Sequence, residues 1–401
     1  MTTMPPDAER VKVSVIVPAR NEEASLGACL GSLVAQTGLP FEIIVVDDHS
    51  TDRTHEIATS FQGVQVVKAG PLPEGWTGKN NAITTGARHA QSQWLLFTDA
   101  DTVHLPGSLT AAVKEAEENG VEMLSYSPEQ IAVTFWEMAT LPVVFAELAR
   151  QYPPAKVSDP ASPLAAANGQ YILIRRAAYD AVGGHAAVAH DILEDVALAR
   201  AVKTSGHRIR FRYAPTAVRT RMYRNYHQLR DGWTKNLALL FPNPGWLAVK
   251  TVALWVLGWG VLVAPFVMLL GDILIKHIPS LAWLHNLLFS VLLSFERGLK
   301  YWWIALLMLT NGRNFVRLRR ANFDLAMEWL GAIFGMPMFA YLLLRSKRAH
   351  SNHRVFWKGR TYGAEHLTEN LISADQAPHP GSSRTMDVLT DPAATARGGL
   401  S

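Results

Sequence analysis

The chain has 401 residues, of which 49% are hydrophobic and 18% charged, and its formal net charge is +4. This composition argues against a disordered chain, and the single cysteine, Cys29, excludes an internal disulfide. The charge is unevenly distributed: residues 1–244 carry a net −3, residues 245–360 a net +10, and residues 361–401 a net −3. We therefore expect no nucleic-acid partner that needs a general basic surface, although a local basic patch stays open.

Residues 1–10 are polar and lack the apolar run of a cleavable signal peptide. From residue 11 to about residue 244, short β-rich runs alternate with helical patterns. The predicted strands are Val13–Val17, Phe41–Val46, Val64–Val67 and Trp94–Thr98, and the predicted helices are Glu22–Ala35 with Asn21 as N-cap, Asp52–Ser60 and Leu109–Asn119. This alternation predicts an α/β domain with a mostly parallel sheet and helices on both faces. Ligands bind such sheets beyond the carboxyl ends of the strands.

A second composition begins near residue 245, where apolar runs follow one another. These runs are Thr251–Gly271, Ile278–Phe295, Tyr301–Leu309 and Leu325–Leu344. About 20 apolar residues are needed to cross a bilayer core of about 30 Å, so the first two runs are predicted to cross and the third is too short. We expect transmembrane or interfacial helices over residues 245–345, with a large buried helical domain as the alternative.

Basic clusters flank the last apolar run, around Arg319 before it and Arg348 after it. Basic loops prefer the cytoplasmic side of a membrane. A single crossing by Leu325–Leu344 would separate the two clusters, whereas the glycines and the proline within this run allow a re-entrant hairpin. We predict two crossings plus this hairpin, then a basic juxtamembrane segment over residues 346–372 and a tail over residues 373–401.

Two pairs of carboxylates directly follow predicted strands. Asp47 and Asp48 follow the second strand, and because a turn needs no adjacent acid pair, we expect them to accept hydrogen bonds from a nucleotide. Asp99 and Asp101 follow the fourth strand, where alternate carboxylates can hold Mg²⁺ together with substrate phosphates. Asp52 is expected instead to cap the next helix.

A glycine-rich loop, Gly75–Ala82, contains Lys79 and opens onto a helical pattern. Its backbone N–H groups and the lysine could approach a phosphate, although the spacing is not that of a P-loop. An ordinary surface loop is the alternative.

Two further clusters carry charge. Asp195, preceded by Glu194, begins a predicted helix and is a candidate general base, although both acids could instead complement the helix dipole. Just before the apolar runs lie Arg230, Trp233 and Lys235. The two cations could hold a diphosphate or face lipid headgroups, and Trp233 could stack on a sugar or lie at the membrane interface.

Taken together, these motifs resemble those of family 2 glycosyltransferases, which have the GT-A (Rossmann-like) fold. The resemblance rests on Val15–Glu23 (VIVPARNEE), Asp47–Asp52, Asp99–Asp101 and Glu194–Asp195, and it covers Val11 to about Leu240. The predicted architecture is then a GT-A domain over residues 11–244, followed by an α-helical transmembrane region.

The resemblance implies a role for each matching residue. Pro18, Arg20, Glu22 and Asp48 would surround the nucleoside of the donor, and Lys79 would lie near its phosphates. Asp99 and Asp101 would bind the diphosphate and a Mg or Mn ion. Asp195 would be the base of an inverting single displacement.

Motifs outside this core resemble bacterial lipid glycosyltransferases, both the carotenoid (diaponeurosporenoate) and the hopene-associated kinds. They are Gly183–His185, Arg221–Tyr223, Asp231–Lys235 and Trp357–Tyr362. This likeness implies a nucleoside diphosphate sugar donor, with a UDP-sugar favoured, and an isoprenoid-type lipid acceptor. It also implies a multi-pass protein of the bacterial inner membrane with a cytoplasmic catalytic domain. Alternatives are transfer to polyprenyl phosphate and a non-catalytic membrane scaffold or transporter.

Overall fold

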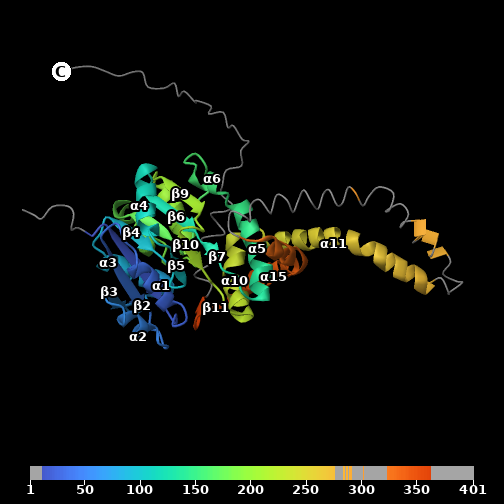
Figure 1. Cartoon of the computed structure of the whole chain (residues 1–401), viewed down its shortest axis with the longest axis horizontal. Coiled ribbons are helices and arrows are strands. Elements are labelled where there is room, and N and C mark those ends of the chain that lie inside the picture. The colour runs from blue at the N-terminus through green and yellow to red at the C-terminus, as the bar shows by residue number, and fades with distance from the viewer. Residues whose placement is uncertain are drawn as a thin grey trace, which may run out of the picture.

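A computed structural model describes residues 11–275, 283–284, 286–287, 289–290, 301 and 323–362. Its centre is a seven-stranded sheet with the order β3-β2-β1-β4-β8-β6-β9 (Figure 1). The strands are β1 (Val13–Ala19), β2 (Phe41–Asp47), β3 (Val64–Lys68), β4 (Trp94–Phe97), β6 (Met123–Ser127), β8 (Ile172–Arg175) and β9 (Ile209–Tyr213). All four strands predicted from the sequence are present.

The sheet is mostly parallel, as predicted. Strand β1 pairs in parallel with β2 and β4, β2 with β3, and β6 with β9. Strand β8 is antiparallel to both neighbours, β4 and β6. The parallel strands β1, β2 and β4 therefore end at the same edge, and the acids that follow them are brought together.

Helices cover both faces of this sheet, because its strands are apolar on both sides. One face carries α1 (Leu26–Val34), α2 (Thr54–Thr59) and α4 (Ser108–Glu118). The other carries α3 (Gly78–His89), α7 (Arg176–Ala181) and α9 (Glu194–Thr204).

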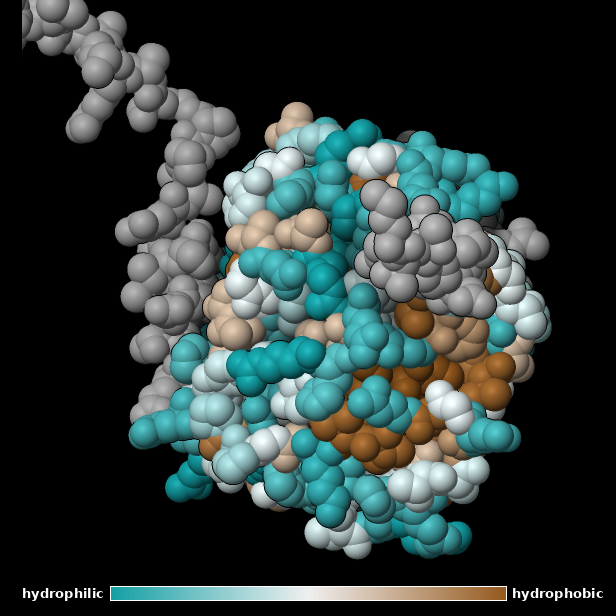
Figure 2. All heavy atoms as spheres, turned by 90° about the vertical axis from the view of Figure 1, so that its left-hand side faces the viewer, coloured by the Kyte–Doolittle hydropathy of each residue, from teal (hydrophilic) through white to brown (hydrophobic). Residues whose placement is uncertain are grey.

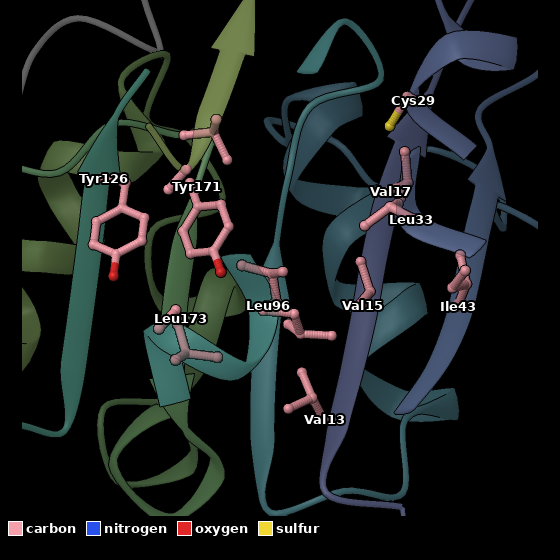
Figure 3. Packing of buried hydrophobic residues seen from close by; sticks show 14 of the residues in the cluster. Val13, Val15, Val17, Cys29, Leu33, Ile43, Leu96, Tyr126, Tyr171 and Leu173 are labelled. Carbon is pink, nitrogen blue, oxygen red and sulfur yellow. The ribbon is translucent and has the colours of Figure 1, made fainter. Parts of the chain in front are cut away.

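The first of these layers holds a close-packed core (Figure 3). Val13, Val15 and Val17 alternate along β1 and are fully buried, as the two-residue period of a strand requires. At the other end of the layer, the rings of Tyr126 and Tyr171 stack with centroids 4.8 Å apart.

Two predicted helices start later than expected. The helix predicted from Glu22 begins at Leu26, because Asn21 adopts a left-handed φ of 52° and its side chain accepts a hydrogen bond from the Thr51 N–H. The helix predicted from Asp52 begins at Thr54, and the Asp52 carboxylate accepts the Thr54 N–H at 3.0 Å. The N-cap position is Arg53, which makes no side-chain cap hydrogen bond, so the prediction that Asp52 is the cap is wrong in position, although its carboxylate still binds this first-turn N–H.

Smaller elements complete the α/β part. A three-stranded sheet has the order β5-β10-β7, from Thr102–His104, Val218–Thr220 and Glu129–Gln130. Short helices α6 (Pro154–Ser158) and α8 (Gly184–Ala187) lie in the connections. The face of the molecule in Figure 2 is mostly hydrophilic, with hydrophobic side chains gathered in one area.

A helical part lies beside the α/β part. Its helices are α5 (Phe135–Gln151), α10 (Tyr226–Leu240), α11 (Pro244–Ile275), α14 (Leu325–Leu330) and α15 (Met336–Ser351), with a π-helical segment, η4 (Gly331–Gly335), between the last two. Helix α11 extends away from the sheet (Figure 1). Helices α5, α10, α11 and α15 share a third buried core. Strands β11 (Val355–Trp357) and β12 (Arg360–Tyr362) form an antiparallel hairpin after α15.

The re-entrant hairpin predicted over Leu325–Leu344 is wrong, because α14, η4 and α15 form one continuous helix over Ala326–Ser351. The glycines allow close packing instead of a chain reversal. A Cβ on Gly335 would lie 1.9 Å from the Ala139 carbonyl oxygen, so only glycine lets η4 approach α5 this closely. Two indole N–H groups of α11, from Trp255 and Trp259, donate to carbonyl oxygens of η4 at 2.9 Å each.

Among the described residues, one helix, Ala326–Ser351, is long and apolar enough to cross a membrane. A second candidate arises if the bent pair Tyr226–Leu240 and Pro244–Trp259 counts as one span. Of the predicted crossings, Ile278–Phe295 lies mostly outside the described residues. The predicted boundary at residue 345 falls inside α15.

Candidate active site

A cavity of about 640 Å³ lies at the carboxyl edge of the central sheet. It is lined from the ends of β1, β2 and β4, from the start of α9, from α10, and from the β11–β12 hairpin. The predicted site residues that line it are Pro18, Arg20, Glu22, Asp48, Lys79, Asp99, Asp101, Glu194, Asp195, Trp233 and Lys235. Asp47 and Arg230 are not among the lining residues, which corrects the two predictions made for them.

The two adjacent acids after β2 face different surroundings, since successive side chains of a strand point to opposite sides. Asp48 lines the cavity, and its backbone carbonyl accepts a 2.6 Å hydrogen bond from Arg20 Nη1. The Asp47 carboxylate accepts the Ser50 N–H at 3.0 Å and lies 3.4 Å from His55 Nδ1. Asp47 therefore stabilises the turn after β2 and does not face the cavity.

Lys79 links two acidic clusters that are far apart in the sequence. It lies in the first turn of α3, whose N-cap, Thr77, accepts the Asn80 N–H at 3.2 Å. Its Nζ lies 2.7 Å from Asp99 Oδ1 and 2.7 Å from Glu194 Oε1. Lys79 therefore neutralises part of the acidic charge at the centre of the cavity, and the surface-loop alternative for Gly75–Ala82 does not describe this residue.

The Asp101 carboxyl is a buried acidic group of the cavity. Its Oδ1 is buried and has no hydrogen-bond partner within the described part of the chain. Burial, and next the negative charges of Asp99 and Glu22, raise the pKa of Asp101 to about 7. A buried acceptor without a donor, beside a second carboxylate, is the environment that a hard divalent cation suits.

The protein alone supplies few ligands for such an ion. Across residues 11–275 and the described segments beyond them, no group of three or more His, Cys, Asp or Glu is arranged to hold a metal. A metal ion at this place would have the Asp99 and Asp101 carboxylates as its protein ligands. This fits Mg²⁺, which typically binds one or two carboxylates and completes its shell with substrate phosphates and water.

The raised pKa of Asp101 has a consequence for stability. An aspartate whose folded pKa exceeds its unfolded value binds a proton more tightly when folded, so the free energy of unfolding falls as pH rises from about 4 to about 7. We expect Asp101→Asn to raise the unfolding temperature of the metal-free protein by about 2–4 °C at pH 8, and by less at pH 5. Thermal unfolding in detergent with a chelator measures both values.

The matched control for this measurement is Asp47→Asn. The Asp47 carboxylate has hydrogen-bond and ionic partners in the β2 turn, so its replacement is expected to lower the unfolding temperature. An Asp101→Asn protein that melts below the wild type at pH 8 would contradict the assignment of Asp101 as a carboxyl destabilised by burial.

Asp195 lies at the other side of the cavity, in the first turn of α9. Its Oδ2 accepts the Gly169 N–H at 2.9 Å and its Oδ1 accepts the Val196 N–H at 2.8 Å. Burial, and next the charge of Glu194, raise the pKa of Asp195 to about 6. The carboxylate is thus oriented by two backbone donors and is ionised at neutral pH, which suits a general base.

Helix α10 contributes a wall of the cavity. Trp233 is buried, and its ring lies 5.9 Å from Tyr223 and 6.3 Å from Phe145 between centroids. It packs in the interior rather than at a membrane surface, although it also lines the cavity. Lys235 lines the same wall. Arg230 Nε instead donates to Asp231 Oδ1 at 2.8 Å.

The other arginines near this helix also have protein partners. Arg219 pairs with Glu129, and Arg221 Nε lies 3.1 Å from Glu137 Oε1. Arg224 Nη2 donates to the Ala24 carbonyl at 2.7 Å. The first contact joins β10 to β7, the second joins the end of β10 to α5, and the third joins the segment before α10 to the segment before α1.

Sequence reasoning missed the contribution of the C-terminal hairpin. Phe356, Lys358 and Arg360 line the cavity, whereas the sequence placed the two cations in a basic juxtamembrane segment and in the motif Trp357–Tyr362 without assigning either to the site. Arg360 binds Asp48, and Lys358 binds Glu22. A Lys-Gly pair between two short β-rich runs, Val355–Trp357 and Arg360–Tyr362, was the available signal of a two-residue hairpin loop.

With the sheet and the residues at its carboxyl edge described, the chain can be compared with known protein families. A family model described as glycosyl transferase family 2 matches residues 14–183. Residues 14–183 thus resemble a family 2 glycosyltransferase domain, and the sheet that they help to form has a GT-A-like α/β fold.

More particularly, the chain resembles the 4,4'-diaponeurosporenoate glycosyltransferase of Staphylococcus aureus strain USA300. The two are 28% identical over 255 residues, which are 61% of this chain and 66% of the relative, just under two thirds of its length. In strain MRSA252 the identity is 29% over 255 residues.

Two solved structures show limited similarity to this chain. The mannosyltransferase PcManGT from Pyrobaculum calidifontis, solved with GDP-Man and Mn²⁺, has a TM-score of 0.48 at 18% identity, covering 86% of this chain and 88% of its own. Staphylococcus aureus TarS 1–349, solved with UDP-GlcNAc, has a TM-score of 0.39 at 18% identity, covering 60% of this chain and 67% of its own.

Proposed function

We propose that the chain is a membrane-bound inverting glycosyltransferase that moves a sugar from a nucleoside diphosphate sugar to an isoprenoid-type lipid. The observation that carries this proposal is the gathering of Asp48, Asp99, Asp101 and Asp195 around one cavity. A UDP-sugar is the favoured donor. The name of the Staphylococcus aureus relative supports a carotenoid-type acceptor, and a hopanoid-like lipid is the other acceptor of this class.

In this proposal, the donor binds at the edge formed by β1, β2 and β4. Asp48 accepts hydrogen bonds from the nucleoside, beside Pro18, Arg20 and Glu22. Lys79 lies nearer the diphosphate, between Asp99 and Glu194, and gives it a positive charge. Asp99 and Asp101 would hold Mg²⁺ or Mn²⁺, which when bound neutralises charge on the departing diphosphate.

The chain's own residues carry the proton transfer. Asp195 takes the proton of an acceptor hydroxyl, and the oxygen attacks the anomeric carbon of the sugar. The bond from that carbon to the phosphate oxygen breaks, and its electron pair leaves with the nucleoside diphosphate. One displacement inverts the configuration. A carboxylate acceptor has no proton to remove, so its transfer does not require Asp195 as a general base. Glu194 positions Lys79 through its 2.7 Å ion pair.

Membrane attachment would bring the lipid acceptor to this cavity. Helix α11 exposes large apolar side chains, among them Trp246, Val249 and Leu254, with exposed fractions of 70%, 57% and 52%. Such a surface is costly in water and favourable in a bilayer. The helix Ala326–Ser351 is a candidate crossing. We propose the bacterial inner membrane, with the catalytic domain in the cytoplasm, where nucleotide sugars are made; the multi-pass arrangement stays a prediction.

Transfer of labelled sugar tests this function. Membranes containing the chain are incubated with labelled UDP-glucose, UDP-galactose or UDP-GlcNAc, Mn²⁺ and an isoprenoid lipid extract, and the organic phase is counted. We expect label in a lipid product for at least one donor, and background label with Asp101→Asn. A product labile to mild acid would identify polyprenyl phosphate as the acceptor. A protein that binds no nucleoside diphosphate would support the scaffold or transporter alternative.

A further inference from the structure

The β11–β12 hairpin lies against the donor edge of the sheet although it follows the last described helix of the chain (Figure 1). Helix α15, which precedes the hairpin, is bonded to α10. The Ser346 hydroxyl donates to the Thr234 carbonyl at 2.6 Å, and His350 Nε2 lies 2.8 Å from the Lys235 carbonyl. Strand β11 packs against α10, and the hairpin lines the cavity.

The hairpin loop has a strained residue whose contacts lie in the cavity. Lys358 and Gly359 form the two-residue loop, with left-handed φ values of 46° and 78°. A lysine rarely adopts this conformation, and such strain persists where surrounding contacts impose it. Lys358 Nζ donates to the Arg20 carbonyl at 3.1 Å and pairs with Glu22, while Arg20 Nε donates to the Lys358 carbonyl at 3.2 Å.

Arg360 makes the closest contact between the hairpin and the sheet. Its Nη1 and Nη2 donate to the two carboxylate oxygens of Asp48 at 2.5 and 2.9 Å. The Asp48 side chain is only 5% exposed, so this bidentate pair fixes its orientation. A Cβ on Gly78 would lie 1.4 Å from Arg360 Nη1, so a glycine at the start of α3 is what admits the guanidinium.

Charge supports a binding role for the hairpin. The lining of the cavity contains seven acidic residues and seven Lys or Arg residues, and two of these cations, Lys358 and Arg360, come from the hairpin. A nucleoside diphosphate is an anion, so a cavity without these two cations would bind it less well.

We propose that the β11–β12 hairpin is a wall of the donor-nucleotide site. In this site Arg360 is a positioning residue that holds Asp48 toward the nucleoside, and Lys358 adds positive charge beside Glu22. This inference rests on the proposed function, because it takes a nucleoside diphosphate as the ligand of the cavity.

Nucleotide binding by the full-length protein in detergent tests the proposal. UDP, and GDP in parallel, are titrated with Mn²⁺ present, into wild type, Arg360→Met, Lys358→Met and Arg354→Met. Arg354 is the matched control, since it is exposed in the same segment and does not line the cavity. We expect Arg360→Met to weaken binding by about tenfold or more and Lys358→Met by about threefold or more, with Arg354→Met within twofold of wild type.

Steady-state kinetics give a second readout that a purely structural role would not move in the same way. Arg360→Met is expected to raise the donor KM while kcat at saturating donor stays within about threefold of wild type. Arg360→Lys keeps the cation without the planar fork and is expected to bind UDP more weakly than wild type but more tightly than Arg360→Met. If Arg360→Met does not fold, Arg360→Lys decides alone, and wild-type affinity in that variant would overturn the proposal.

The remaining outcomes separate two failures. Unchanged UDP affinity in Arg360→Met, with binding intact in the wild type, overturns the hairpin's role and leaves the proposed function standing. Tighter binding in that variant also overturns it, and would mean that Arg360 excludes the nucleotide from Asp48. A wild type that binds neither UDP nor GDP overturns the proposed function and this inference together.

Discussion

Replacing Asp101 with asparagine is expected to lower kcat/KM for sugar transfer by about 10²–10³-fold, the range seen when a charge-stabilising group is removed from a transition state. Asp101 supplies a buried carboxylate oxygen with no partner among the described residues, beside Asp99. The amide keeps the shape and removes the negative charge that a divalent ion requires. Initial rates of labelled-sugar transfer at several Mn²⁺ concentrations measure the loss.

The control is again Asp47→Asn, an identical change to a carboxylate that does not line the cavity. Its transfer rate is expected to stay within about threefold of wild type, because the change affects only the packing of the turn after β2 and removes no group from the cavity. Retention of more than a tenth of wild-type kcat/KM by Asp101→Asn at every Mn²⁺ concentration would remove Asp101 from the metal site. Asp101→Asn is therefore expected to lower the transfer activity while it raises the unfolding temperature, so one residue would favour activity at the expense of stability.

The pH profile of transfer is expected to report the Asp195 carboxyl. Burial and the charge of Glu194 raise its pKa to about 6, so the basic form predominates above that pH and is lost below it. We expect kcat/KM to fall about tenfold for each unit of pH below 6 in the wild type. Asp195→Asn is expected to lose about 10²–10⁴-fold in kcat and to lose this acidic limb.

The same variant should leave UDP affinity within about twofold of wild type, because Asp195 is oriented by the Gly169 and Val196 N–H groups rather than by donor-side residues. A loss of less than tenfold in kcat, with the acidic limb preserved, would show that Asp195 is not the base. That result would also favour a carboxylate as the acceptor group, since such an acceptor carries no proton to remove.

The local pattern of apolar and polar residues in the sequence predicted much of this fold. Continuous apolar runs identified β1, β2 and β4, and parallel pairing then placed Asp48, Asp99 and Asp101 at one edge. Strand alternation predicts that Asp47 and Asp48 point to different sides, but only the structure shows that Asp48 is the one that lines the cavity. The bounds of α1 depended on a left-handed Asn21, which no periodicity reveals.

Other parts of the site depend on contacts between distant segments, which a single sequence does not encode in any local pattern. The pairing of Lys79 with Glu194 joins α3 to α9 across the cavity. The re-entrant hairpin was inferred from helix-breaking residues, whereas Gly335 serves close packing against α5. Arg360 was assigned to membrane topology because basic residues beside apolar runs are usually a topology signal.

The ion pair between Asp48 and Arg360 joins residues that are 312 positions apart in the chain. A ribosome completes the whole sheet, α10 and every apolar run before it reaches Arg360. The Asp48 carboxylate therefore has no Arg360 partner until nearly the whole chain has been synthesised. Because domains generally fold as units in the order of synthesis, we expect the wall of the cavity that the hairpin forms to be completed last.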